Sequence, residues 1–275
     1  MREARELAER ALALHPRSGV ADHALAHARH ERGWGRAGVD FLDAWLAEDP
    51  QAVQSRHLHW HAALQSLVCG DFTDARRRAD TALARTDVGM RAATNWRLLL
   101  AGQTPAGRTD PEKVRELLAA PGGMTEVFHT FNLAPALAVE AATDDLHALA
   151  RRAAADERPD YREVLAPVVL APAEVTAGRP RAAVNLLGGL GGTAARIGGV
   201  RVEREIVQDT LARALVDAGE PARAAGLLHH RISTRRHHTY EDLLLAMRTP
   251  TGAEVPGGVD GGDVSGTARS ARARG

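Results

Sequence analysis

The sequence predicts an all-α fold in which helix–turn–helix units stack into an α-solenoid, without a β-sheet. Three observations support this fold class. A Gly followed five residues later by a small residue occurs four times, each time between two segments of helical apolar spacing: Gly33/Gly38, Gly70/Ala75, Gly178/Ala183 and Gly219/Ala224. Two prolines, Pro16 and Pro50, are 34 residues apart. Aromatic residues make up only 4% of the chain and Ala is abundant, which favours close helix–helix packing.

The first predicted helix spans Arg2–Leu14, with Ala4, Ala8 and Ala11 on one face and Pro16 after its end. It corresponds to the second helix of a unit whose first helix does not precede it in this sequence. Because part of its apolar face then lacks a partner, we expect self-association through this helix, low solubility, or an origin in a longer protein.

Two complete units follow between Ala21 and Ala82, and they explain the Gly signature. The Gly ends the first helix without a Cβ penalty, and the small residue lets the second helix lie close to the first. The 34-residue period is that of the tetratricopeptide repeat. Four positions of the first unit fit that repeat, namely Ala26, Gly38, Leu42 and Pro50, whereas Trp45 stands where the repeat normally has Ala.

The rest of the chain is less regular. Asp110 and Pro111 form a helix start, as cap and first-turn residue. Segments 131–147 and 161–176 are expected to be helical despite their prolines. The sequence predicts one repeat domain over residues 1–248 and a disordered tail over 249–275, where Gly, Ser, Asp and Arg replace apolar residues.

Composition excludes some classes of function. The formal net charge is zero, which argues against a nucleic-acid or anionic-membrane partner. A single cysteine, Cys69, rules out an internal disulfide and fits a cytoplasmic location. No apolar run approaches the roughly 20 residues that a membrane span needs. Nearly all cationic residues are Arg, with Lys113 the only Lys, a composition typical of GC-rich, actinobacterial-type genomes.

Histidines gather on the first helices of the two complete units. His23 and His27 are four residues apart, and His30 adds a third residue to their helical face. His57 and His61 form a second i, i+4 pair on the next first helix. In the tetratricopeptide register, His23, His27, His30, His57 and Trp60 take groove positions, with His61 beside them; these six are the candidate ligand-binding residues.

The histidines allow two interpretations. The first is that they line the groove or hydrogen-bond between helices, and we expect this one. The alternative is that His23, His27, His57 and His61 bind Zn or a similar transition metal. No HExxH arrangement and no carboxylate partner is evident in the sequence, so a complete ligand set cannot be counted. No catalytic residue and no cofactor is assigned.

Other features carry weaker signals. The segment 189–194 matches G-x-G-x-x-A, but a predicted helix precedes it where a dinucleotide site needs a strand, so we expect a flexible loop. The basic run from His229 to His238 could meet an anion, although a solvated helix end is the expected interpretation. Cys69 is expected to be a small buried packing residue.

Several segments resemble the tetratricopeptide repeat protein 38 family in order and spacing. They are Val20–His27 with Glu31-Arg32-Gly33, His57–Leu64, Asn95–Leu98, and Arg196–Gly199 with Glu203-Arg204-Glu205. The resemblance covers roughly residues 1–240 and implies a helical repeat fold without implying a settled activity. The family has a further His where this chain has the segment 131–135; His129 could substitute for it.

Together these observations predict a repeat protein that holds a protein or peptide partner in a groove lined by His, Trp and Arg. The alternative is a metal-dependent or otherwise catalytic protein that uses the His23, His27, His57 and His61 cluster. The sequence favours a non-enzyme without deciding the point.

Overall fold

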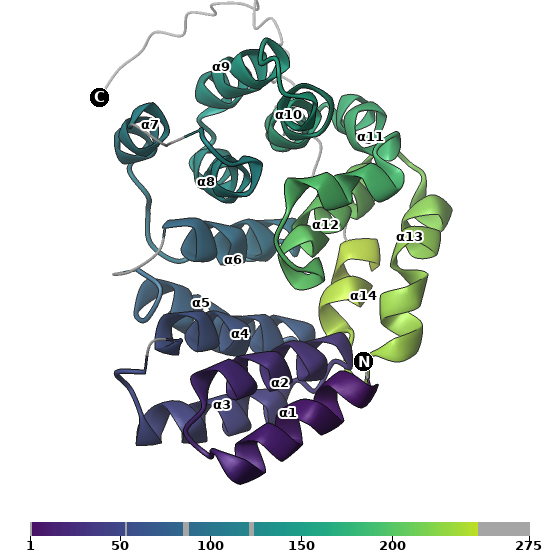
Figure 1. Cartoon of the computed structure of the whole chain (residues 1–275). Helices are drawn as coiled ribbons and strands as arrows, with labels where there is room; N and C mark the ends of the chain where they lie inside the picture. The colour runs from purple at the N-terminus through teal and green to yellow at the C-terminus, as the bar shows by residue number, and fades with distance from the viewer. Residues whose placement is uncertain (1, 53, 85–87, 121–123, 247–275) are drawn as a thin grey trace, which may run out of the picture.

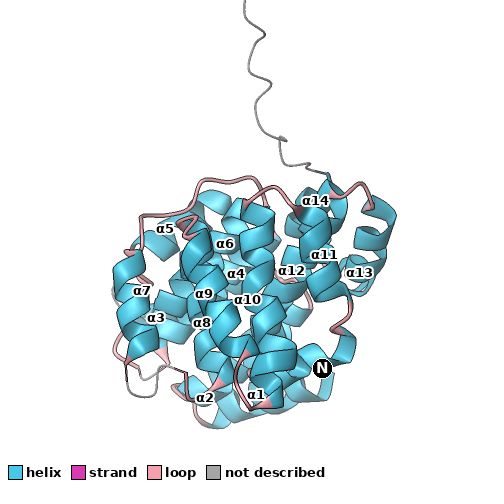
Figure 2. Cartoon of the chain, turned by 90° about the horizontal axis from the view of Figure 1, so that it is seen from above, coloured by secondary structure: helices cyan, strands magenta, loops and turns pink. Residues whose placement is uncertain are grey.

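The computed structural model describes residues 2–52, 54–84, 88–120 and 124–246, and within these ranges the chain is helical, with no strand (Figure 2). The first seven helices are α1 (Arg2–Leu14), α2 (Gly19–Glu31), α3 (Arg36–Glu48), α4 (Ser55–Val68), α5 (Phe72–Asp80), α6 (Val88–Leu100) and α7 (Pro111–Ala119). The next are α8 (Val127–Val139), α9 (Thr143–Ala154), the π-helical turn Asp160–Leu165, α10 (Ala166–Thr176) and α11 (Pro180–Gly188). The 3₁₀ helix Gly191–Ile197, α12 (Arg201–Asp217), α13 (Pro221–Thr234) and α14 (Thr239–Ala246) complete the described chain. The all-α prediction is therefore confirmed over these ranges.

The even-numbered helices from α2 to α12 form an inner ring. Each packs on the next, and α12 returns to contact α2, so the helices follow a closed curve in Figure 1. The odd-numbered helices pack on the outside of this ring, as α3 does on α4 and α11 on α10 and α12. The inner helices are therefore expected to be more buried than the outer helices.

Burial along the helices reflects this division. Ten residues of α4, including the whole run from Trp60 to Val68, are buried. The outer helix α5 buries only Ala75, Arg78 and Ala79. A helix that is buried on all sides belongs inside a structure, whereas a single apolar stripe suits an outer position.

The segment between α13 and α14 meets the turn after α2. The backbone N–H of Arg236 donates to the carbonyl of Arg32 at 2.9 Å, and that of His237 donates to the carbonyl of Gly33 at 3.1 Å. Helix α14 also packs on α4. These contacts fasten the C-terminal helices to the first hairpins.

The Gly-plus-five signature has the predicted geometry. The four signature glycines all have positive φ, between 59° at Gly33 and 86° at Gly219. The small residues five positions later lie at helix crossings: a Cβ on Gly38 would be 2.7 Å from the side chain of Gln65, and Ala75, like its counterparts in the later units, is fully buried.

Helix boundaries agree with the sequence in some places and differ in others. Asp110 caps α7 by accepting a hydrogen bond from the N–H of Glu112, as predicted. The segment 131–147 is not one helix. Helix α8 ends at Val139, Ala141 takes a positive φ of 54°, and α9 begins at Thr143. No Gly marks this turn, which explains why the sequence did not reveal it.

The N-terminal helix has its predicted bounds and packs on α2, with Leu7 51% and Leu14 77% exposed. Self-association through it stays a prediction. The segment 249–275, predicted to be a disordered tail, lies outside the described residues. Among the described helices, none has the length and apolar character required to cross a membrane.

Candidate metal centre and adjoining cavity

Helices α2 and α4 bring four histidines into one cluster. His23 and His27 lie one turn apart on α2, and His57 and His61 lie one turn apart on α4. One ring nitrogen from each of the four falls within 4.8 Å of the others. The ring centroids of His23 and His57, and those of His27 and His61, are 4.3 Å apart across the two helices. We call these residues the four-histidine cluster.

Few of the ring nitrogens in the cluster have hydrogen-bond partners. The Nε2 atoms of His23 and His27 lie 2.9 Å apart, so one of them donates to the other. His61 is fully buried, and neither of its ring nitrogens has a hydrogen-bond partner among the described residues. Nε2 of His57 is likewise buried and unpartnered there. Buried polar atoms are usually satisfied, so these exceptions require an explanation.

Burial keeps the cluster neutral. It lowers the pKa of His27 to about 3, with further lowering from His23 and His57, and lowers the pKa of His57 to about 4. The pKa of fully buried His61 falls well below its ordinary value for the same reason, and that of His23 is also lowered. Each imidazole therefore has one unprotonated ring nitrogen at neutral pH, which is the form that binds a metal.

The cluster fits a tetrahedral transition-metal ion after a small adjustment. Zn²⁺ with Zn–N bonds of about 2.0–2.1 Å holds its ligand nitrogens about 3.3 Å apart. The largest separation in the cluster is 4.8 Å. Metal binding would draw the most distant nitrogens together by up to about 1.5 Å, and rotation of the imidazole rings about their side-chain torsions would contribute to this contraction. Four imidazoles suit Zn, Cu, Fe or Ni.

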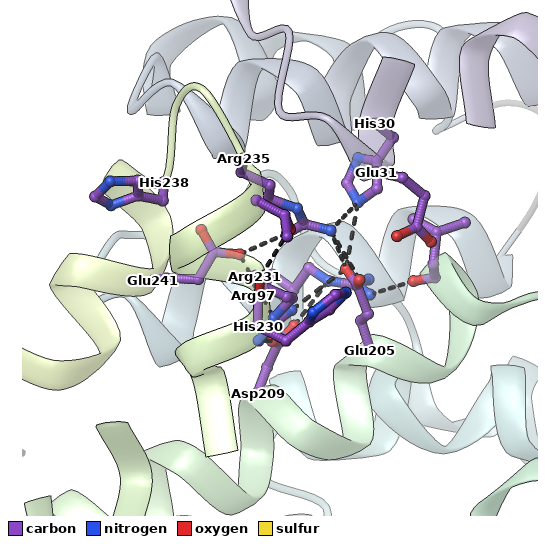
Figure 3. A network of polar contacts seen from close by, with 12 residues as sticks. His30, Glu31, Arg97, Glu205, Asp209, His230, Arg231, Arg235, His238 and Glu241 are labelled. Atoms are coloured by element: carbon purple, nitrogen blue, oxygen red, sulfur yellow. Dashed lines mark hydrogen bonds and ion pairs between the residues drawn. The ribbon is translucent and has the colours of Figure 1, made fainter. Parts of the chain in front are cut away.

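His30 has a different environment, although the sequence groups it with His23 and His27. It is 3% exposed, and its Nε2 lies 3.2 Å from Glu205 of α12 and 3.1 Å from Arg235 (Figure 3). The pKa of His30 falls to about 4 because of burial and the nearby Arg235. It therefore belongs to a second buried polar group and lies outside the four-histidine cluster.

That second group is a network of buried ion pairs. Arg235 pairs with Glu205 at 2.7 Å and with Glu241 at 2.5 Å, and Arg231 pairs with Asp209 at 2.6 Å. We call this the ionic network; its members are His30, Arg97, Glu205, Asp209, Arg231, Arg235 and Glu241, all buried. Its three carboxylates balance three guanidinium groups, and Figure 3 shows them converging from α6, α12, α14 and the C-terminal end of α13.

The ionic network corrects one expectation. The basic run from His229 to His238, which spans the end of α13, was expected to be a solvated helix end, yet Arg231 and Arg235 are 3% and 6% exposed and are paired with carboxylates. Their neighbours His229, Arg236 and His237 are exposed, as expected. The acidic partners come from α12 and α14, so local sequence shows only the basic half.

A cavity of about 620 Å³ adjoins the four-histidine cluster. His57 and Trp60 of α4 form one wall, and α6 contributes Val88, Met90 and Ala93. The remaining wall comes from α7, α8 and α12. Its polar members are Lys113, Glu126, His129, Asn132 and Glu203. His57 thus belongs both to the cluster and to the cavity wall.

The other predicted site residues take these places. Trp60 is 3% exposed, packs against His57 and His61, and lines the cavity. Its Nε1 has no acceptor within the described part of the chain. His129, considered as a substitute ligand, lines the same cavity from α8 and lies outside the cluster.

Two weaker sequence features have structural explanations. The segment 189–194 follows helix α11, as expected, and leads into the 3₁₀ helix Gly191–Ile197 where a flexible loop was expected. Without a strand before it, this segment has no dinucleotide-binding geometry. Cys69 is half-buried after α4, and burial raises its thiol pKa, which disfavours the reactive thiolate.

Comparison with known proteins adds no identification: no protein-family model, no curated protein and no solved structure matches this chain. Conclusions about its function therefore rest on the cluster, the cavity and the network themselves.

Proposed function

We propose that this chain is a tetratricopeptide-type helical-repeat protein whose four-histidine cluster binds one transition-metal ion, such as Zn²⁺, between α2 and α4. The four repeats of the Gly-plus-five signature and the layered helices support the repeat assignment. The observation that carries the metal proposal is the cluster itself, where four ring nitrogens lie within 4.8 Å of one another.

The state of His61 supports this function over simple packing. A buried imidazole with two unbonded nitrogens carries a desolvation cost that no hydrogen bond offsets. A metal ion would satisfy one nitrogen of each ligand and would convert this cost into binding free energy. A packing role gives no comparable reason for gathering four histidines with their nitrogens facing inward.

The test is metal content and calorimetric Zn²⁺ titration of protein prepared without a polyhistidine tag. We expect about one equivalent per chain. His27→Ala should lose the ion, whereas His59→Ala should keep it. His59 is the matched control because it is half-buried on the same helix α4 and lies outside the cluster.

The folded state of His27→Ala is checked by circular dichroism, and His57→Gln provides a second, milder variant. Folded variants that bind Zn²⁺ as the wild type does would overturn the metal proposal and leave the histidines as packing groups.

A second candidate function is a peptide-binding module, and the cavity favours it. The walls of the cavity include inner helices α4, α6, α8 and α12, and inner helices commonly provide the binding surface of repeat arrays. Selection of short peptides on the wild type and on Trp60→Ala tests it. Peptides that bind only the wild type would support this function, and the absence of any Trp60-dependent peptide would remove it.

A further inference from the structure

On the α4 wall of the cavity beside the four-histidine cluster, His57 Nε2 and Trp60 Nε1 are buried and have no hydrogen-bond partner among the described residues. We propose that this cavity binds a small apolar carboxylate, oriented so that the carboxylate accepts a hydrogen bond from Trp60 and reaches the metal ion beside His57. This inference rests on the metal-binding function proposed above.

The indole of Trp60 lines the cavity and is almost completely buried, and its Nε1–H has no acceptor within the described ranges. A buried tryptophan N–H normally finds an acceptor. Because Nε1 is itself covered in this structure, a ligand oxygen in the cavity would supply the acceptor after a small rotation of the indole.

The position of His57 supports the same ligand. Of the four clustered histidines, His57 is the one that lines the cavity, so a ligand there approaches the ion from its side. Four neutral imidazoles leave the full charge of a divalent ion uncompensated, which attracts an anion. Zinc sites can also expand from four to five ligands.

The charge on the wall formed by α7, α8 and α12, opposite in composition to the α4 wall, also bears on the ligand. This wall carries Lys113 together with two carboxyl groups, those of Glu126 and Glu203, so its summed charge does not favour a second anion. Between the walls, α6 contributes Val88, Met90 and Ala93, and α8 adds Phe128 and Leu133. A ligand that suits both regions has one carboxylate at the α4 wall and an apolar body along α6 and α8.

The experiment uses the full chain loaded with Co²⁺ in place of Zn²⁺, because the visible spectrum of Co²⁺ reports its coordination. Octanoate is the probe, and octanamide is its neutral counterpart. We expect octanoate to weaken the visible bands, as five-coordinate Co²⁺ absorbs less than tetrahedral Co²⁺, and octanamide to leave them unchanged. A chain that binds no Co²⁺ would instead contradict the proposed metal function.

Trp60→Phe keeps the ring and removes the N–H donor. We expect it to retain Co²⁺ and to bind octanoate about tenfold more weakly, the effect of one lost charge-assisted hydrogen bond. Trp45→Phe is the matched control, since Trp45 is buried on α3 outside the cavity. It should bind octanoate as the wild type does.

Two results would overturn the carboxylate assignment while leaving the metal site intact. One is a Co²⁺ spectrum that octanoate does not change. The other is octanoate binding that is lost in Lys113→Met and unchanged in Trp60→Phe, which would place the carboxylate at the wall that carries Lys113. A free acid and a peptide C-terminus share this chemistry, so a short apolar peptide with a free or amidated C-terminus distinguishes the two sources.

Discussion

Helix α2 contributes to two buried polar regions. In one the side chains are charged and ion-paired, and in the other they are neutral. His27 and His30 are three residues apart, yet His27 joins a neutral cluster and His30 joins a charged network. In the ionic network every charge has an opposite charge within about the length of a hydrogen bond, as Arg235 has with Glu205 at 2.7 Å. In the four-histidine cluster, His61 is buried with no hydrogen-bond partner among the described residues.

The two regions therefore differ in how they contribute to the stability of the fold. Burial alone would raise the pKa of Glu205, but Arg235 and Arg231 hold it well below its ordinary value, so the carboxylate is stabilised in its charged form. No such partner compensates His61. The charges of the ionic network are therefore balanced without a ligand, although His30 Nδ1, Arg231 Nε and Glu241 Oε2 have no hydrogen-bond partner among the described residues. In the four-histidine cluster His61 has neither a counter-charge nor a hydrogen bond there, which is the unused bonding capacity expected of a binding site.

The largest expected effect comes from breaking the ionic network. Glu205→Ala leaves Arg231 and Arg235 buried with one carboxylate fewer, and removal of one partner from a buried ion pair costs about 3–5 kcal/mol. Urea unfolding should show this loss. Glu112→Ala is the control, because Glu112 forms an exposed pair with Arg115, and exposed ion pairs contribute little to stability. Equal losses of unfolding free energy in Glu205→Ala and Glu112→Ala would contradict a stabilising role for the ionic network.

The next largest expected effect is on the pH dependence of the free energy of unfolding, to which the four-histidine cluster contributes through His61. Because burial lowers the pKa of His61 well below 6.5, the unfolded chain binds a proton as the pH falls through 6.5 and below, and the folded chain does not bind it over this window. The free energy of unfolding therefore falls as pH falls through this window. His61→Leu should reduce that slope by up to about 1.4 kcal/mol per pH unit.

Asp22 acts in the opposite direction in the same window. Burial raises its pKa to about 7, so there the folded chain binds the extra proton and stability rises as pH falls. Since Asp22 is present in both proteins, its contribution cancels when the slopes of wild type and His61→Leu are subtracted. Identical slopes in the two proteins would mean that His61 is charged or exposed in solution.

The smallest expected effect is the change in stability caused by His61→Leu in the absence of metal. Its sign tells whether the imidazole of His61 costs or contributes stability. In metal-free protein at pH 8, His61→Leu replaces a buried, unbonded imidazole with an apolar side chain. We expect a gain in stability of about 1 kcal/mol, because the desolvation cost is removed. Thermal unfolding measures this change in stability. A loss of 3 kcal/mol or more would show that His61 makes hydrogen bonds in the folded chain.

Much of the fold follows from local sequence. Proline and Asp at Asp110-Pro111 start a helix, and glycines such as Gly33 end one, because their backbone preferences act at single positions. The i, i+4 spacing of His23 and His27 also places two rings on one face without tertiary information. The repeat pattern then makes α2 and α4 neighbours, which is why the histidine pairs could be grouped before the structure.

The ionic network could not be found in the same way. Arg97 and Asp209 are 112 residues apart, and no local pattern distinguishes a buried Arg in α13 from a solvated one. The turn at Ala141 was missed because an alanine with positive φ leaves no sequence signal. Burial of Trp60 also depends on helices that follow it by many residues.

The contact between α12 and α2 has a consequence for how the chain reaches its folded state. His30 finds Glu205 across 175 residues and Arg235 across 205 residues. In an open repeat array each unit can form as soon as its neighbour exists, but here the first complete hairpin lacks its final partners until the last helices have been synthesised. Assembly from the N-terminus should therefore pause with His30 exposed, and closure of the ring becomes the slow, long-range step.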